Sequence, residues 1–169
     1  DETLSANLVL VDNEMLKIKY DEAINKNRPY ISHEFKVDPS KCMEIEIGGT
    51  KAVIAAIPLK ECIKIPGIKD GSLFRKNVRQ SLGTNNKVNK GIVSTLKKDI
   101  EGFFLYHNGI TAICSKITRK DDTLSVKELN VVNGCQSLTT IYSCSESVRN
   151  INDGYIMFRF YEISYPENA

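Results

Sequence analysis

The chain has 169 residues, of which 41% are hydrophobic and 26% charged, with 23 Lys and Arg against 21 Asp and Glu. This balance is that of one ordinary globular domain and excludes a disordered tail, a collagen and a coiled coil. No stretch approaches the roughly 20 consecutive apolar residues of a membrane span, and the first residues lack the basic and apolar parts of a signal peptide. We therefore expect a cytoplasmic protein without a membrane partner.

The five cysteines are scattered without a Cys-x-x-Cys pair, and the chain has only two histidines. Disulfide frameworks and zinc sites need recognisable ligand spacings, so we expect no metal site and no cofactor. The chain starts without Met and ends shortly after a strand-like segment. We expect it to be a piece of a longer protein whose other parts include an effector domain.

The first part of the chain, residues 1–66, is predicted to be β-rich. Strand-like runs cover residues 8–10, 16–20, 43–47 and 52–57. The last two runs flank Gly48-Gly49, and because glycines accept the positive φ of a tight turn, we expect an antiparallel hairpin there. Pro58 suits the first position of a short helix through residue 63, and a loop follows.

Two basic amphipathic helices are predicted in the centre of the chain. In residues 72–82 apolar side chains recur every fourth position, and Asp70 or Ser72 can cap the start. Asn89 is expected to cap the second helix. Its apolar stripe is Ile92, Val93, Leu96 and Ile100. Residues 72–98 carry seven Lys and Arg and no acid, which creates a positive potential that attracts phosphates or acidic partners.

The second part, residues 67–169, is expected to continue into a mixed sheet that carries a strand–turn–helix unit. Strands are predicted over residues 110–117, 124–132 and 155–165, with an irregularity at Lys127-Glu128, where the alternation fails. Asn133-Gly134 then turns into a helix that runs to about Asn150. The predicted fold class is therefore α+β, with a β-rich N-terminal layer, two central helices and this mixed sheet in one compact domain.

The turn at residues 133–137 is the most informative segment for function. The first turn of a helix leaves backbone N–H groups without acceptors and carries partial positive charge, so an anion can bind there if the backbone is approachable. Gly134 would allow this approach, and Arg75 and Arg79, one helical turn apart, would neutralise the anion. An Asn-Gly pair before a helix often serves only as a turn and cap, and this alternative stays open.

Four sequence blocks resemble, in order, the signature blocks of the abortive infection phage resistance (AIPR) family. They lie at residues 74–83, 88–96, 104–111 and 132–137. His107 and Ser137 stand where family members commonly have Asn and Thr. The resemblance implies a bacterial or phage-defence setting.

The amides in these blocks either satisfy backbone groups in turns or line a polar cleft that reads phosphates or base edges. On the second interpretation, the candidate ligand-binding residues are two arginines, the amides and the residues of two Asn-Gly turns. They are Arg75, Asn77, Arg79, Asn89, Asn108, Gly109, Asn133, Gly134, Gln136 and Ser137.

The same turn is more distantly similar to phosphate-handling turns of ParB-like proteins, of sulfiredoxin and of restriction proteins with an Asp-Gly-Gln-Gln-Arg block. This similarity implies a ParB- or sulfiredoxin-like second half. Ser137 stands where those proteins have an Arg, and Asn133 replaces an acid. Cys135 is either a nucleophile whose pKa is lowered at the helix start, as in sulfiredoxin, or a small buried thiol.

The sequence therefore predicts a phage-defence domain that binds a phosphate-bearing ligand, either a nucleotide or nucleic acid. One alternative is part of a nuclease or nucleotide hydrolase that other segments complete, with Mg²⁺ as its cofactor; which residues would be catalytic stays open. Another is a basic module that docks an acidic protein. Glu44 and Glu46 share one strand face and could hold a metal, although exposed strand glutamates are commoner.

Overall fold

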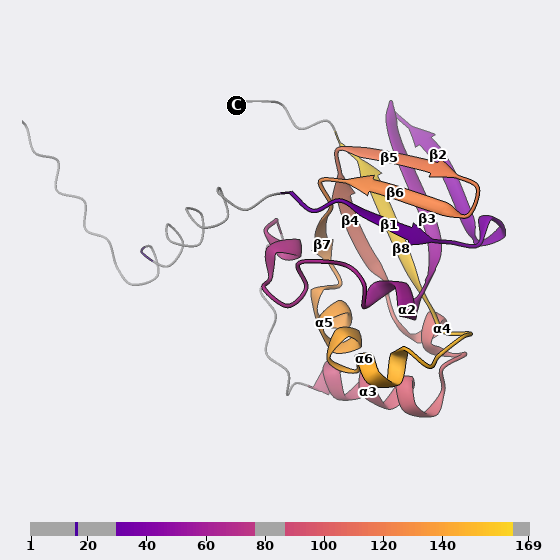
Figure 1. The fold of residues 1–169 in the computed structure, drawn as a ribbon, viewed down its shortest axis with the longest axis vertical. Coiled ribbons are helices and arrows are strands. Elements are labelled where there is room, and N and C mark those ends of the chain that lie inside the picture. Colours follow the sequence, from indigo (N-terminus) through magenta and orange to yellow (C-terminus); the bar gives the residue numbers. More distant parts are fainter. Residues whose placement is uncertain (1–15, 17–29, 77–86, 164–169) are drawn as a thin grey trace, which may run out of the picture.

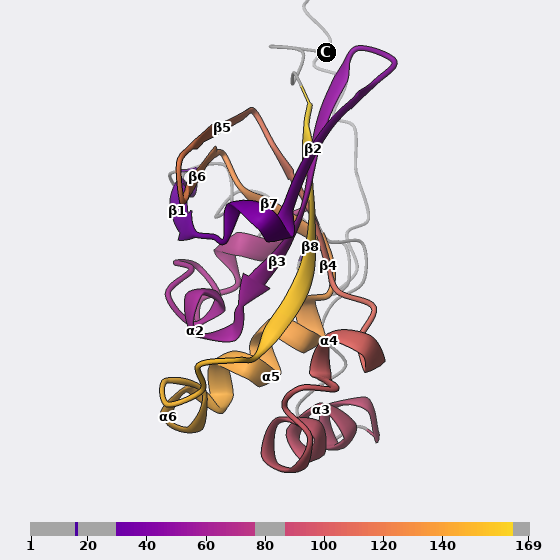
Figure 2. The same cartoon turned by 90° about the vertical axis from the view of Figure 1, so that its right-hand side faces the viewer.

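A computed structural model of the chain describes residues 16, 30–76 and 87–163. In these residues the strands form a three-stranded and a five-stranded sheet, and most of the helices gather at one end of the sheets (Figure 1). Figure 2 shows the smaller sheet packed as a second layer on one face of the larger one. The architecture is α+β, as the sequence predicts.

The three-stranded sheet has the order β1-β6-β5 and is antiparallel throughout. Its strands are β1 (His33–Lys36), β5 (Lys116–Lys120) and β6 (Thr123–Lys127). The turn between β5 and β6 contains Asp121, whose φ is +51°. Aspartate tolerates this left-handed conformation better than most residues, which is why a turn forms at Asp121-Asp122.

The five-stranded sheet has the order β2-β3-β8-β4-β7. Its strands are β2 (Cys42–Ile47), β3 (Thr50–Pro58), β4 (Ile110–Cys114), β7 (Asn130–Asn133) and β8 (Tyr155–Glu162). β4 and β8 are parallel and all other pairs antiparallel, so the predicted mixed sheet is confirmed. The predicted hairpin is also confirmed, with Gly48 and Gly49 at φ +58° and +76°.

The chain crosses twice between the two sheets at one place. The predicted strand 110–117 is interrupted at Ser115, whose N–H donates to the carbonyl oxygen of Lys127 over 2.9 Å. The predicted strand 124–132 is also interrupted: β6 ends at Lys127, and Glu128 follows with a φ of +54°. The irregularity predicted at Lys127-Glu128 is therefore confirmed, and it separates β6 in one sheet from β7 in the other.

Aromatic side chains fill the space between the two sheets. Phe35 of β1 lies 5.6 Å from Phe158 and 5.4 Å from Phe160, both of β8, between ring centroids, and all three are fully buried. Successive strand residues point to opposite faces, so Met157 and Arg159 lie on the other face of the sheet. That second face is therefore free to carry a site.

The helices pack at the lower end in Figure 1 and against the sheet edges. They are α2 (Leu59–Cys62), α3 (Lys87–Lys98), α4 (Phe103–Tyr106), α5 (Cys135–Ser143) and α6 (Ser145–Val148), with 3-10 turns η1 (Pro39–Lys41) and η2 (Ser72–Phe74). The predicted helix at 133–150 is confirmed with an interruption at Cys144. Pro58 is the last residue of β3 and directly precedes α2, instead of lying inside it.

The prediction of a regular helix from residue 72 is wrong for its described part. Residues 72–74 form the 3-10 turn η2, and residues 77–82 lie outside the described part of the chain. The Asp70 carboxylate accepts hydrogen bonds from the Ser72 N–H (3.0 Å) and hydroxyl (2.7 Å). Asp70 thus holds the start of the turn, as expected of a cap.

The second predicted helix corresponds to α3, and it begins earlier than expected. It starts at Lys87, so Asn89 lies inside its first turn and is not its cap. Ile92 and Leu96 are buried, and α3 packs against α5. The predicted strand 8–10 lies outside the described residues, as does 16–20 except Leu16, which is helical. Within the described part of the chain, no helix is long and apolar enough to cross a membrane.

Candidate functional site

The two Asn-Gly turns of the sequence blocks meet in space. Asn108-Gly109 directly precedes β4 and Asn133-Gly134 ends β7, and these two strands pair with Thr111 opposite Asn133. A Cβ atom at Gly134, where φ is +92°, would lie 2.9 Å from the carbonyl oxygen of Gly109 and 2.5 Å from Cδ1 of Ile110. Gly134 is therefore required for the close approach of the two turns. We call residues 108–111 and 133–137, together with Arg159, the junction site.

Gly109 extends this close packing to β8. Its φ is +78°, and a Cβ atom there would lie 2.5 Å from the carbonyl oxygen of Met157. The Asn133 side chain accepts a hydrogen bond from the N–H of Gly134 over 3.0 Å, which fixes the second turn. Both glycines are thus explained by packing of backbone on backbone, and Asn133 by local turn formation.

Arg159 is a residue of this site that sequence analysis missed. The register places Arg159 of β8 opposite Thr111 of β4, which in turn lies opposite Asn133 of β7. Residues directly opposite each other share a sheet face, so the three residues form a row across three strands, next to the register shift between Thr111 and Ala112. The Arg159 guanidinium donates a hydrogen bond to the carbonyl oxygen of Asn108 over 3.3 Å.

Within the described residues, the charge of Arg159 is not compensated by a carboxylate. The side chain is half-buried, and no carboxylate among residues 30–76 and 87–163 lies within ion-pair distance of it. A partly buried guanidinium with unused donors is well suited to bind carboxylate or phosphate. No spacing in the sequence marks Arg159. Only the alternation of apolar and other residues in the predicted last strand could have shown that Arg159 faces away from the core.

The first turn of α5 borders the same row. Gly134 provides no side-chain cap, and the first hydrogen bond of the helix joins the N–H of Leu138 to the carbonyl oxygen of Gly134 over 3.0 Å. The N–H groups of the three preceding helix residues, Cys135, Gln136 and Ser137, therefore have no acceptor within the helix. Gln136 and Ser137 are half-buried, so their side chains lie at the surface next to these groups.

Cys135 is not an activated thiol. Its side chain is buried, at 8% exposure, and burial raises the pKa of the thiol, against a smaller lowering from a hydrogen bond with Thr139. Desolvation thus opposes the alternative of a lowered pKa at this helix start. The structure favours the alternative of a small buried thiol.

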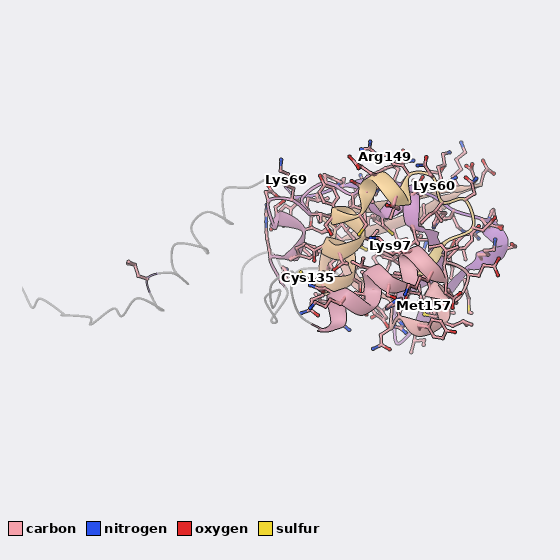
Figure 3. The ribbon with its side chains drawn as sticks, turned by 90° about the horizontal axis from the view of Figure 1, so that it is seen from below. Lys60, Lys69, Lys97, Cys135, Arg149 and Met157 are labelled. Atoms are coloured by element: carbon pink, nitrogen blue, oxygen red, sulfur yellow. The ribbon has the colours of Figure 1, made fainter. Side chains whose placement is uncertain are left out.

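The other predicted ligand-binding residues lie in two places. Arg75 follows η2, which packs against β7, and its guanidinium stands 6.0 Å from the ring centroid of Tyr30. Asn89 is buried in the first turn of α3, and Figure 3 shows this end of α3 beside Cys135. Asn77 and Arg79 lie outside the described residues. The structure thus brings together Asn108, Gly109 and residues 133–137, with η2 and α3 adjoining.

Glu44, one of the two possible metal ligands of β2, is engaged otherwise. Glu44 accepts a hydrogen bond from Nε of Arg119 (2.6 Å) and forms an ion pair with Nζ of Lys51 (3.0 Å). These two cations lower the pKa of the Glu44 carboxyl. In the described part of the chain, no group of three or more His, Cys, Asp and Glu side chains could hold a metal ion. Glu44 therefore ties β2 to β3 and β5.

The two histidines share one electrostatic feature. Nε2 of His33 and of His107 is buried and has no hydrogen-bond partner among the described residues. Desolvation lowers the pKa of both imidazoles; at His33 the nearby Glu61 and Glu34 partly oppose this effect and Lys64 adds to it. His107 packs on Phe103, 4.1 Å between ring centroids. Both rings are therefore neutral in the folded protein near pH 7.

This feature predicts acid sensitivity. The unfolded chain, with histidine pKa values near about 6.5, takes up protons before the folded one, so the free energy of unfolding should fall as pH drops below about 6.5. In the double variant His33→Gln, His107→Gln, the urea-denaturation midpoint should change less between pH 7 and pH 5 than in the wild type. The described carboxylates with lowered pKa values titrate below this range. An unchanged slope in the double variant would assign the effect to other groups.

The model of one protein family, described as AIPR protein, matches residues 74–169. This match covers more than half of the chain. The chain belongs to the AIPR family. No curated protein and no solved structure matches the chain, so its likeness to ParB and sulfiredoxin folds stays a prediction. The whole junction site lies inside the AIPR match.

Proposed function

We propose that this AIPR protein acts in abortive infection or phage defence by binding a phosphate-bearing ligand, a nucleotide or nucleic acid, at the junction site. AIPR membership supports the defence role. The observation that carries the binding proposal is the position of Arg159. The strand register sets Arg159 in one row with Thr111 and Asn133, and its guanidinium has no carboxylate partner among the described residues.

Each group at the junction site has a defined part in this proposal. Arg159 provides the charge and bidentate donors for a phosphate. The hydroxyls of Thr111 and Ser137 and the amide of Gln136 provide neutral hydrogen bonds, and the N–H groups at the start of α5 add partial positive charge. Arg75 belongs to the proposal as a further cation, since η2 packs against β7. Arg79 is proposed from the sequence alone.

Substitution of Arg159 tests the proposal. Arg159→Gln in the full chain should weaken binding of inorganic pyrophosphate about 10- to 100-fold in equilibrium titrations, because a charge-assisted hydrogen bond contributes about 1.5–3 kcal/mol. Arg149→Gln is the matched control, since this exposed arginine follows α6, well away from Cys135 in Figure 3. Circular dichroism shows whether both variants fold. Equal affinities for Arg159→Gln and the wild type would refute the proposal.

A further inference from the structure

An apolar groove lies on the face of the five-stranded sheet that points away from the three-stranded sheet. It has a volume of about 440 Å³ and its side chains come from β2, β3, β8 and α4, chiefly Met43, Ile54, Ala56, Phe104, Tyr155 and Met157. In Figure 2, α4 stands on this side of the sheet at the lower end. The volume is in the range of small-ligand pockets, about 300–1,000 Å³.

Arg159 adjoins the groove in the strand register. Ile54, which lines the groove, lies opposite Arg159 in the pairing of β3 with β8. Met157 also lines the groove and precedes Arg159 by two residues on the same face, a spacing of about 7 Å along a strand. Met157 in turn packs against Gly109 of the junction site. The register therefore sets Arg159 beside Ile54 and Met157 at one end of the groove.

The opposite end of the groove carries a compensated charge. The Lys41 ammonium pairs with the Asp38 carboxylate (3.1 Å), hydrogen-bonds to the hydroxyl of Tyr155 (3.3 Å) and lies 4.5 Å from the centroid of that ring. Hydrogen bonds from Ser40 and Lys41 lower the pKa of Asp38 to about 2, so this pair persists at neutral pH. Arg159, in contrast, has no carboxylate partner among residues 30–76 and 87–163 and lies beside an apolar surface.

We propose that the junction site and the groove together bind one nucleotide unit, with its phosphate at Arg159 and its base in the groove. This inference rests on the proposed function. Two thioether side chains and the Phe104 ring offer polarizable and aromatic surface of the kind on which bases stack. The spacing between Met157 and Arg159 is comparable with the span from a base to its 5′-phosphate.

The test compares adenosine 5′-monophosphate with ribose 5-phosphate, which keeps the sugar and phosphate but lacks the base. The full chain should bind the nucleotide about tenfold or more tightly, since stacking of one base contributes on that scale. Ala56→Trp, which fills the groove, should abolish this difference and leave ribose 5-phosphate binding unchanged. Thr118→Trp, at an exposed position of β5, is the matched control.

A second variant guards against misfolding of Ala56→Trp. Phe104→Ser removes the ring from α4 and should reduce the nucleotide preference several-fold without altering ribose 5-phosphate binding. Equal binding of the two ligands by the wild type, or a nucleotide preference that survives both groove variants, would overturn the inference. If Arg159→Gln still weakens pyrophosphate binding, either result leaves the proposed function standing. If Arg159→Gln does not weaken pyrophosphate binding, the proposed function itself is refuted.

Discussion

Replacing Phe35 by alanine should lower the free energy of unfolding by about 3–5 kcal/mol, the cost of deleting a fully buried aromatic side chain. Phe35 is 0% exposed and contacts Phe158 and Phe160, so it joins the three-stranded sheet to the centre of the five-stranded one. Urea denaturation followed by circular dichroism measures the change. Phe35→Leu, which retains much of the apolar volume, should cost less than about 1.5 kcal/mol.

The same variant tests whether the two predicted parts of the chain, 1–66 and 67–169, fold as one domain. Phe35 lies in the first part and outside the AIPR match, whereas its partners lie in β8. We expect one cooperative transition that shifts as a whole, because strands of both parts pair within both sheets. Two separate transitions, of which Phe35→Ala moves only one, would show independent units.

Alanine at Gly109 or Gly134 should also destabilise the protein strongly, by about 2–5 kcal/mol. The left-handed backbone costs a residue with a Cβ atom about 1–2 kcal/mol. The crowding against the carbonyl oxygens of Met157 or Gly109, at 2.5 and 2.9 Å, adds about 1–3 kcal/mol. Thermal and urea unfolding measure the loss.

Gly48→Ala is the control for these glycine variants. Gly48 has a φ of +58°, but nothing lies within 4 Å of the position of its Cβ atom. Its substitution should therefore cost only about 1 kcal/mol, the backbone strain alone. If all three alanine variants were equally stable, the close contact between the two Asn-Gly turns would not hold the junction site together.

Local patterns were sufficient to predict the parts of the fold that neighbouring residues determine. The hairpin around Gly48-Gly49 follows from alternation and turn chemistry, and the helix after Gly134 follows from its apolar spacing. The break at Lys127-Glu128 is visible as a failure of alternation. Which sheet each half joins depends on pairing partners distant in sequence, and such pairing leaves no local signal.

The regular helix predicted from residue 72 shows where a local pattern fails. The spacing of apolar residues favours a helix, but Asp70 binds both the N–H and the hydroxyl of Ser72, and Leu73 donates to the carbonyl oxygen of Gly67. These contacts stabilise the tighter turn η2. Tertiary and loop interactions therefore override a periodic pattern over a few residues.

The sequence predicts only the part of the candidate site that lies in short local motifs. The AIPR blocks identify both Asn-Gly turns, and the structure places them in contact. Arg159 carries no motif, because its relation to Thr111 and Asn133 exists only through the register of three strands. The sequence therefore predicts the cationic role for Arg75 and Arg79, which lie in its most basic segment.

The location of a bound anion tests the central claim most directly. Titration of the full, ¹⁵N-labelled chain with inorganic pyrophosphate, followed by amide chemical shifts, shows which backbone groups respond. We expect saturable shifts at Gly109 and at residues 134–137, and their loss in Arg159→Gln. Shifts confined to the exposed lysines of α3, Lys97 and Lys98, with no response at these turns, would contradict the account.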